Sequence, residues 1–122
     1  MEYSTKNFSA RELRCKCPIC NRNQPHKMKI EVVDKIQAMR DSIGRPLVIT
    51  SAYRCAKHPV EAKKAKPGQH NAGTAVDIAF ESSNQRYEII KAAIQQGATG
   101  IGWGNGFIHV DFRDSTPVAW DY

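Results

Sequence analysis

Residues 70–80 read HNAGTAVDIAF. The segment from Ala75 to Phe80 has the small and β-branched residues typical of a buried strand. Just before it, Gly73 can form the tight bend that turns His70 back toward Asp77. Imidazole and carboxylate groups are both good zinc ligands, so this stretch predicts a strand with two candidate metal ligands near its start.

Another strand is predicted over residues 107–112, and it contains a further histidine, His109. Alternation along this strand places His109 and Asp111 on one face and the apolar residues between them on the other. Three protein ligands, His70, Asp77 and His109, would leave a fourth position for water, which is the arrangement of catalytic zinc sites. Taken singly, each histidine also fits a surface or hydrogen-bonded role, and the aspartate fits a turn.

The pattern along the chain predicts an α+β fold, because two helices precede a set of strands with one helix inserted. Capping residues and apolar periodicity predict helices over residues 9–13 and 30–43, the second ending at Gly44. A third helix opens at Ser82, ends at Gly97 and is expected to turn four apolar residues inward, namely Tyr87, Ile90, Ala93 and Ile94. Further strands are predicted at 47–50 and 100–103, and a surface loop with one helical turn at 55–69.

The length and composition fit one globular domain spanning residues 1–122. Hydrophobic residues make up 41% and charged residues 25% of the chain, which is enough apolar material for one core. No run of about 18 apolar residues occurs, and Met1 is followed by polar residues where a signal peptide would be apolar. We therefore expect no stable membrane insertion and no signal peptide.

Positive charge is concentrated in the first half of the chain. Residues 1–66 hold 15 Lys and Arg against 6 acidic residues, whereas residues 67–122 hold 3 against 6. Such an excess indicates a polyanionic partner, either nucleic acid, an anionic envelope or a cell-wall polymer. Because the chain lacks aromatic RNA-binding motifs and a zinc-finger order of ligands, nucleic acid is not the expected partner. Part of the excess forms a basic loop of four lysines, Lys57, Lys63, Lys64 and Lys66.

The four cysteines are unevenly placed. Cys15, Cys17 and Cys20 lie within six residues, and Cys55 stands apart. In a reducing cytosol this grouping is more typical of metal ligands or free thiols than of disulfides. Together the four are a candidate structural zinc site that would pin the N-terminal segment against the central strand. The single residue between Cys15 and Cys17 is a tighter spacing than usual, so free buried thiols are the alternative.

Four segments carry motifs that occur together. They are Asn7-Phe8-Ser9 with Glu12-Leu13 and Cys15, ITSAYRC at 49–55 with His58-Pro59, PGQHNAGTAVDI at 67–78, and FIHVD at 107–111. In combination they resemble the zinc D-alanyl-D-alanine carboxypeptidase family, the M15 peptidases, and are most like its short phage-encoded, endolysin-type members. The resemblance implies the fold shared with hedgehog signalling domains and DD-peptidases, with a small antiparallel sheet packed against helices. It also implies that Zn²⁺ is held by His70, Asp77 and His109.

The resemblance also implies roles for residues around the zinc. Arg54 would contact a substrate carboxylate or the oxyanion of the transition state, which makes it both a catalytic and a substrate-binding candidate. Many relatives carry an acidic residue three positions before the last histidine ligand, but that position is Gly106 here. Asp111 is the expected substitute, either as the proton acceptor or as a carboxylate that orients His109.

Aromatic residues are the candidates for a peptide-binding cleft. Tyr53, beside Arg54, and Trp103, between two glycines, are expected to line it, whereas Phe107 fits the core equally well. Gly68 stands where relatives often have a serine, which puts one substrate hydrogen bond in doubt. His58 is an alternative proton shuttle, although its place before Pro59 favours a structural role.

These observations predict a zinc metallopeptidase that hydrolyses an amide bond in the peptide stem of peptidoglycan, with either carboxypeptidase or endopeptidase action. The expected setting is a phage lysis or cell-wall enzyme, monomeric, made in the cytoplasm of the infected bacterial cell and brought to the wall by another factor. The alternative is a catalytically inactive, zinc-containing module that binds the cell wall, because the acid before His109 is missing.

Overall fold

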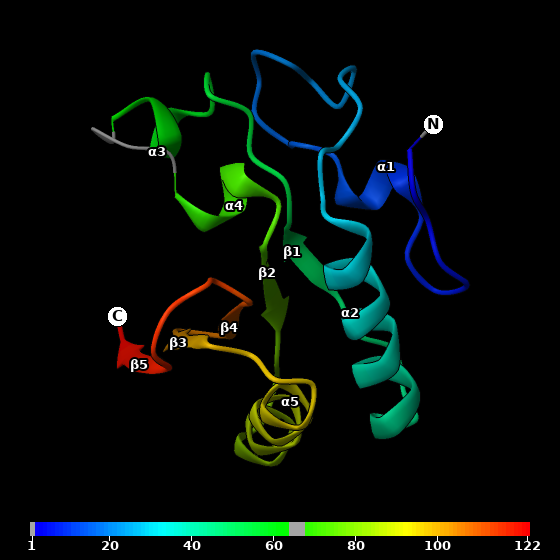
Figure 1. Cartoon of the computed structure of the whole chain (residues 1–122), viewed down its shortest axis with the longest axis vertical. Helices are drawn as coiled ribbons and strands as arrows, with labels where there is room; N and C mark the ends of the chain where they lie inside the picture. Colours follow the sequence, from blue (N-terminus) through cyan, green and yellow to red (C-terminus); the bar gives the residue numbers. More distant parts are fainter. Residues whose placement is uncertain (1, 64–67) are drawn as a thin grey trace.

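The computed structural model describes residues 2–63 and 68–122 of the chain and has a five-stranded sheet at its centre (Figure 1). Its strands follow the order β1-β2-β4-β3-β5 across the sheet. Their bounds are β1 (Ile49–Ser51), β2 (Ala75–Ala79), β3 (Gly100–Gly104), β4 (Phe107–Asp111) and β5 (Val118–Asp121). Helices pack against this sheet, so the α+β class predicted from the sequence is confirmed.

The sheet is mixed, because strands β1 to β4 pair antiparallel whereas β5 runs parallel to β3. The expectation of an antiparallel sheet is therefore wrong at this edge. The reason is local: Asp111, the last residue of β4, lies opposite Gly100, the first residue of β3. The short connection after β4 thus delivers Val118 to the start of β3, and the chain then runs alongside it. Strand β5, whose residues are mostly exposed, was not predicted from the sequence.

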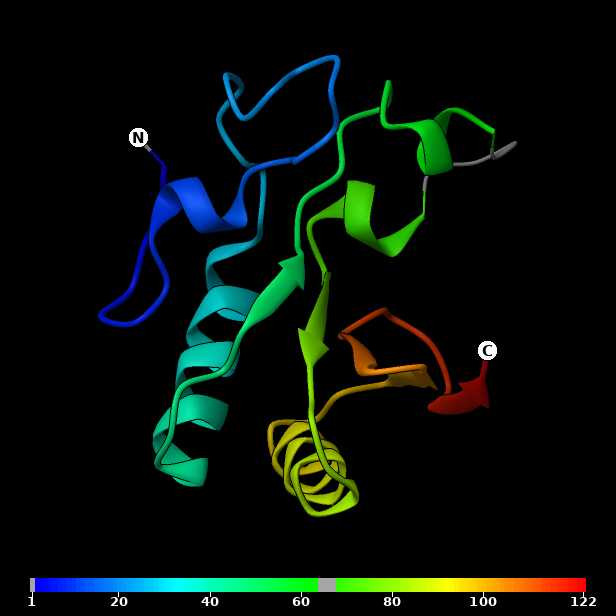
Figure 2. The same ribbon diagram turned by 180° about the vertical axis from the view of Figure 1, so that it is seen from behind.

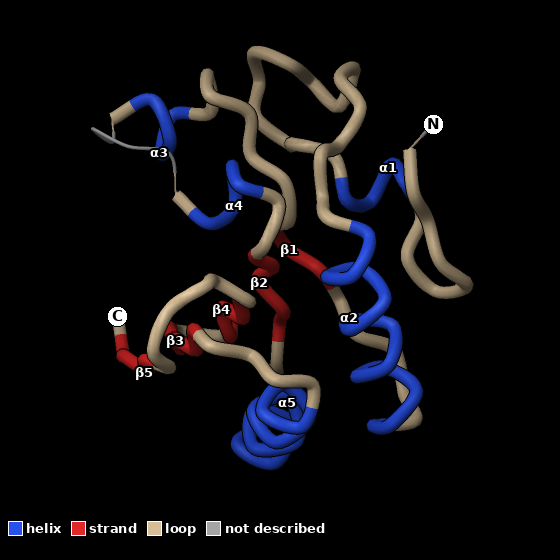
Figure 3. Tube along the Cα trace, in the orientation of Figure 1, coloured by secondary structure: helices blue, strands red, loops and turns tan. Residues whose placement is uncertain are grey.

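Two longer helices and one short one complete the core, and Figure 3 shows them in blue around the red strands. They are α1 (Ala10–Leu13), α2 (Ile30–Ile43) and α5 (Ser83–Gln95). As predicted, Ser9 and Glu12 form a capping box at the start of α1, and α2 ends at Gly44 with a φ of 80°. Helices α2 and α5 contact each other, and α5 also contacts β4. None of the helices in the described part of the chain is long and apolar enough to cross a bilayer.

The inward face of α5 differs from the prediction. Ile89, Ala92 and Ala93 are the buried residues, while Tyr87 is 64% and Ile94 61% exposed. At about 100° per residue, Tyr87 and Ile94 lie roughly 150° round the helix from Ile89. The apolar periodicity therefore identified the helix correctly but assigned two apolar side chains to the wrong face.

The long connection between β1 and β2 holds two short helices, α3 (Pro59–Ala62) and α4 (Gln69–Ala72), where the sequence predicted a loop with one helical turn. His58 caps α3, since its Nδ1 accepts from the backbone N–H of Val60 at 3.1 Å. Helix α4 ends at Gly73, whose φ of 79° and whose close approach to the Lys27 carbonyl leave no room for a side chain. Three residues of the predicted basic loop and zinc motif, Lys64, Lys66 and Pro67, lie outside the described residues.

Candidate active site

The three predicted metal ligands converge. His70 lies on α4, Asp77 on β2 and His109 on β4, and the last two face each other directly across the β2–β4 ladder. The Oδ1 atom of Asp77 lies 3.3 Å from His70 Nε2 and 3.3 Å from His109 Nδ1. All three side chains are buried, and their ligand atoms lie within 4.8 Å of one another. Segments separated by some 30 residues of sequence thus supply one cluster of nitrogen and oxygen donors.

Each histidine is oriented by a hydrogen bond from the ring nitrogen that faces away from the cluster. Nδ1 of His70 lies 2.7 Å from the carbonyl oxygen of Ala52, and Nε2 of His109 lies 2.7 Å from Oδ2 of Asp111. A ring nitrogen that donates to an oxygen carries the proton, which leaves the other nitrogen with a free lone pair. In both rings that lone pair is directed at the cluster, as in metal-binding histidines.

The donor set fits a zinc ion. Oδ1 of Asp77 is buried and has no hydrogen-bond partner, although two ring nitrogens approach it. This is the pattern expected where a cation, and not a proton, joins the three groups, and two imidazoles with one carboxylate are a common zinc ligand set.

Asp111 lies behind His109 and is completely buried. Besides His109 it accepts hydrogen bonds from Arg113, at 2.9 Å from Nε and 2.6 Å from the terminal nitrogen. Although burial opposes ionisation, the guanidinium of Arg113 and the ring of His109 hold the pKa of Asp111 well below the usual range. Both carboxylate oxygens are therefore occupied. The geometry supports an orienting role for Asp111 over a role as proton acceptor.

Arg54 reaches the same cluster from the segment after β1. One terminal nitrogen donates to Oδ2 of Asp77 at 3.4 Å, and the other lies 3.7 Å from Glu61. Glu61 was not among the residues predicted from the sequence; its side chain is only 1% exposed and accepts from the backbone N–H of Gly68 at 2.9 Å. One signal could have drawn attention to it, since it is the only acidic residue between Cys55 and Gln69.

A pocket of about 510 Å³ opens over the three ligands. Arg54 and Arg113 contribute positive charge to its wall. Its aromatic residues are Phe107, whose ring centroid lies 5.1 Å from that of Tyr122, and Trp120, whose ring lies 5.3 Å from that of His109. Trp120 and Tyr122 come from β5 and the residue after it, so the undetected strand supplies much of the aromatic wall.

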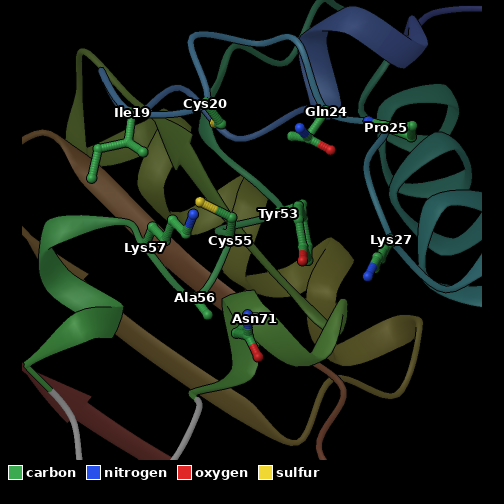
Figure 4. Close-up of a pocket in the computed structure, with 10 residues that line it drawn as sticks. All are labelled: Ile19, Cys20, Gln24, Pro25, Lys27, Tyr53, Cys55, Ala56, Lys57 and Asn71. Carbon is green, nitrogen blue, oxygen red and sulfur yellow. The ribbon is translucent and has the colours of Figure 1, made fainter.

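The two aromatic residues predicted to line this cleft lie elsewhere. Trp103 packs against the hydrophobic core, because alternation along β3 turns the glycines on either side of it toward the site. A β-carbon at Gly102 would lie 2.5 Å from the ring of Trp120, which occupies the space that this glycine leaves open. Tyr53 is buried and lines a second pocket, shown in Figure 4.

Two lysines of the basic loop, Lys57 and Lys63, lie in the described part of the chain. Lys57 borders the second pocket and not the pocket over the metal ligands, and Lys63 is exposed. His58 caps a helix and is not among the described residues that line the site, which agrees with the structural role that its sequence context favoured.

The cysteines form a second cluster, and two of them, Cys20 and Cys55, line the pocket in Figure 4. Their Sγ atoms all lie within 4.8 Å of one another, and none of the four forms a disulfide. Burial opposes ionisation of Cys17, but the backbone N–H of Cys20 and the neighbouring thiols lower the pKa of Cys17 to about 6. The sequence prediction that these four residues meet is thus consistent with the fold.

Comparison with known proteins agrees with this arrangement. A family model described as Peptidase M15 matches residues 6–111, and the chain belongs to this family. The match includes all three metal-ligand candidates and Arg54. At the level of the family, this makes the chain a metallopeptidase of a zinc-dependent group that acts on peptidoglycan. A search of curated proteins gave no match.

Proposed function

We propose that this protein is a zinc metallopeptidase that hydrolyses an amide bond in the peptide stem of bacterial peptidoglycan. One observation carries the proposal: the floor of the pocket holds two imidazoles and a carboxylate whose buried Oδ1 atom has no hydrogen-bond partner. Family membership supplies the substrate class.

His70, Asp77 and His109 would hold the metal. A zinc ion in such a site lowers the pKa of its bound water to about 7 and polarises a carbonyl oxygen. The protein fixes the ligands before substrate arrives, because the carbonyl of Ala52 and the carboxylate of Asp111 orient the two rings. No covalent nucleophile is required for this chemistry.

Arg54 is the residue placed to bind the reacting part of the substrate. It lines the pocket, and contacts with Ser51, Asp77 and Glu61 hold its guanidinium in one orientation. A fixed, forked cation suits either a stem-peptide carboxylate or the oxyanion that develops during amide hydrolysis. The aromatic residues that line the same pocket, Phe107, Trp120 and Tyr122, would give the peptide an apolar surface to lie on.

The biological setting belongs to the same proposal and is supported by the motif resemblance. The enzyme would be a phage lysis protein of the endolysin type, acting as a monomer. It would accumulate in the cytoplasm of the infected cell and reach the wall when another factor opens the membrane. Both carboxypeptidase and endopeptidase action are compatible with a pocket that is open to solvent.

A second candidate, an inactive module that binds the wall, is favoured by one observation. Asp77 is the only acidic residue among the described residues that line the pocket. Glu61 and Asp111 lie nearby, but both make close contacts with arginine side chains. A protein of this kind would bind stem peptides without releasing products.

Digestion of purified peptidoglycan distinguishes the two. We expect the zinc-loaded protein to release new amino groups, with fragment masses that identify the cleaved bond, and we expect a chelator to stop release and added zinc to restore it. His70→Ala should abolish release, whereas His58→Ala, at a helix cap outside the pocket, should keep it. Binding to the wall without any fragments would contradict the peptidase proposal and support the binding module.

Arg54→Lys provides a test of the substrate contact in the same assay. Lysine keeps the positive charge but lacks the paired N–H donors of the guanidinium. Removal of one donor to an oxyanion typically lowers turnover by roughly 10²- to 10³-fold. We expect a loss of about that size with zinc content unchanged. Arg11→Lys, on the exposed side of α1, is the matched control. Equal activity of the two variants would remove Arg54 from the mechanism.

A further inference from the structure

The four cysteines meet outside the pocket over the metal ligands, since none of them is among the described residues that line it. Cys15, Cys17 and Cys20 lie in the loop after α1, and Cys55 lies in the segment after β1. Figures 1 and 2 both show this loop, in blue, next to the green segment that leaves β1. The Sγ atoms are separated by 3.6 Å for Cys15–Cys55, 3.5 Å for Cys17–Cys55 and 3.4 Å for Cys17–Cys20.

These distances fit four thiolates around one ion. A disulfide would bring two sulfurs to about 2.05 Å, which is far shorter than any of the separations here. Zinc bound tetrahedrally by four sulfurs at about 2.3 Å places them roughly 3.8 Å apart. The three separations given above lie within a few tenths of an ångström of that value, and all four sulfurs lie within 4.8 Å of one another, so the backbone already holds them close to the geometry that such a site requires.

The backbone around Cys17 is also shaped for thiolate binding. The N–H of Cys20 donates to Sγ of Cys17 at 3.5 Å, and the N–H of Asn21 donates to the carbonyl oxygen of Cys17 at 2.9 Å. Asn21 and Arg22 follow with φ values of 45° and 59°, the only non-glycine residues with positive φ in the described part of the chain. Left-handed conformations at two successive residues are costly, and a bound ion would compensate for that cost.

The burial of the cysteines and the charge near them also favour a bound zinc ion. Cys15 is 1%, Cys17 3% and Cys20 9% exposed. Zinc with four thiolates carries two net negative charges, and Lys27 and Lys57 line the pocket that Cys20 and Cys55 border (Figure 4). Free thiols acting as small apolar residues would need neither this convergence of four sulfurs nor nearby cations.

We propose that Cys15, Cys17, Cys20 and Cys55 bind a second, structural zinc ion. Its effect would be to cross-link the loop after α1 to the segment after β1. That segment carries Arg54, which precedes Cys55 directly, and the Ala52 carbonyl that orients His70. Hydrogen bonds from Lys16 to the carbonyl of Ile49 and from the Tyr53 N–H to that of Leu13 join the same two regions of the chain. The ion would therefore hold one wall of the active site in place without touching substrate.

Metal analysis of the full chain, prepared with zinc and a reductant, tests the proposal. We expect two zinc ions per chain in the wild type, one in His70→Ala, and loss of the other ion in Cys17→Ser. A thiol-specific mercurial added to the wild type should release one equivalent of zinc as four thiols react, which avoids any dependence on the folding of a variant. The His70→Ala chain, reconstituted with cobalt, should show intense thiolate-to-metal charge-transfer absorption.

Three results would overturn the proposal independently of peptidase activity. The first is a single zinc in the wild type with none in His70→Ala. The second is an intact mass lower by the hydrogens that disulfide formation removes, in protein isolated under reducing conditions. The third is a cobalt spectrum without thiolate charge transfer.

Discussion

At the scale of single residues, Asp111 shows how the structure refines a choice that the sequence left open. Alternation along β4 placed it on the face of His109, which allowed either a proton-accepting or an orienting role. The structure gives it no exposure and pairs it with His109 and Arg113. A carboxylate in that position fixes the tautomer of the ligand ring and raises its basicity.

Asp111→Asn should therefore lower activity by weakening the binding of zinc to His109. We expect zinc affinity and kcat/KM to fall by roughly 10- to 100-fold, as is typical when the partner of a ligating histidine is lost. Competition with a chelator measures the first quantity and release of amino groups the second. Asp114→Asn, at an exposed position three residues along, is the matched control. Full zinc affinity combined with a large loss of turnover would instead favour a direct role in proton transfer.

At the scale of elements, β3 leaves room for the candidate active site because every second residue of the strand is a glycine, which has no side chain. Its three glycines face the site, and β-carbons at positions 100, 102 and 104 would collide with the Asp111 carboxylate, the Trp120 ring and the Phe107 ring, respectively. The strand thus provides a flat surface on which side chains from β4 and β5 lie. A strand of larger residues would displace them.

Gly102→Ala tests this role of β3. A methyl group there should push the ring of Trp120 away from its place beside His109 and lower kcat/KM by about 10- to 100-fold, because small displacements in an active site are costly. Zinc content should not change. Gly44→Ala is the control, since it strains a left-handed residue at a cost of about 1–2 kcal/mol but meets no atom within 4 Å. Equal activity in the two variants would show that the position of Trp120 does not matter.

The elements that could be predicted from the sequence are those with a strong local signal. Helix α2 has a regular apolar stripe and a glycine stop, and β2 and β4 carry the metal-ligand candidates in register with their alternation. Strand β5 could not be predicted, because it lies at an edge, has little buried surface and depends on where β4 ends. The positions of Trp120 and Glu61 are set by tertiary contacts, which leave no periodic trace in the sequence.

At the scale of the whole molecule, the fold joins two regions of opposite charge. The basic first half contributes Arg54, and the acidic second half contributes Asp77, His109 and Asp111. The N-terminal segment is fastened in a similar way, since Glu2 accepts from Nε of Arg14 at 3.0 Å and from the backbone N–H of His26 at 2.7 Å. These two hydrogen bonds connect the start of the chain to Arg14 and His26, which lie before and after Cys15, Cys17 and Cys20 in the sequence.

The dependence of the Tm on pH should reveal the contribution of the hydrogen bond between Glu2 and Arg14. The hydrogen bond from Arg14 lowers the pKa of Glu2 from 4.5 to about 2. Ionised Glu2 therefore stabilises the fold at every pH above its ordinary pKa, and this contribution is lost as the pH falls toward 2. We expect Glu2→Gln to lower the Tm at pH 7 and to match the wild type near pH 2. Glu81→Gln, at an exposed position, is the control, and a Tm difference for Glu2→Gln that did not change with pH would contradict the assignment.

We propose above that three side chains from α4, β2 and β4 hold one zinc ion at the floor of an open pocket. Anomalous X-ray diffraction at the zinc edge, from crystals of the reduced full chain grown with zinc, tests it most directly. We expect an anomalous peak about 2.0–2.2 Å from His70 Nε2, Asp77 Oδ1 and His109 Nδ1. Absence of a peak there, with the three side chains hydrogen-bonded to other groups, would contradict it.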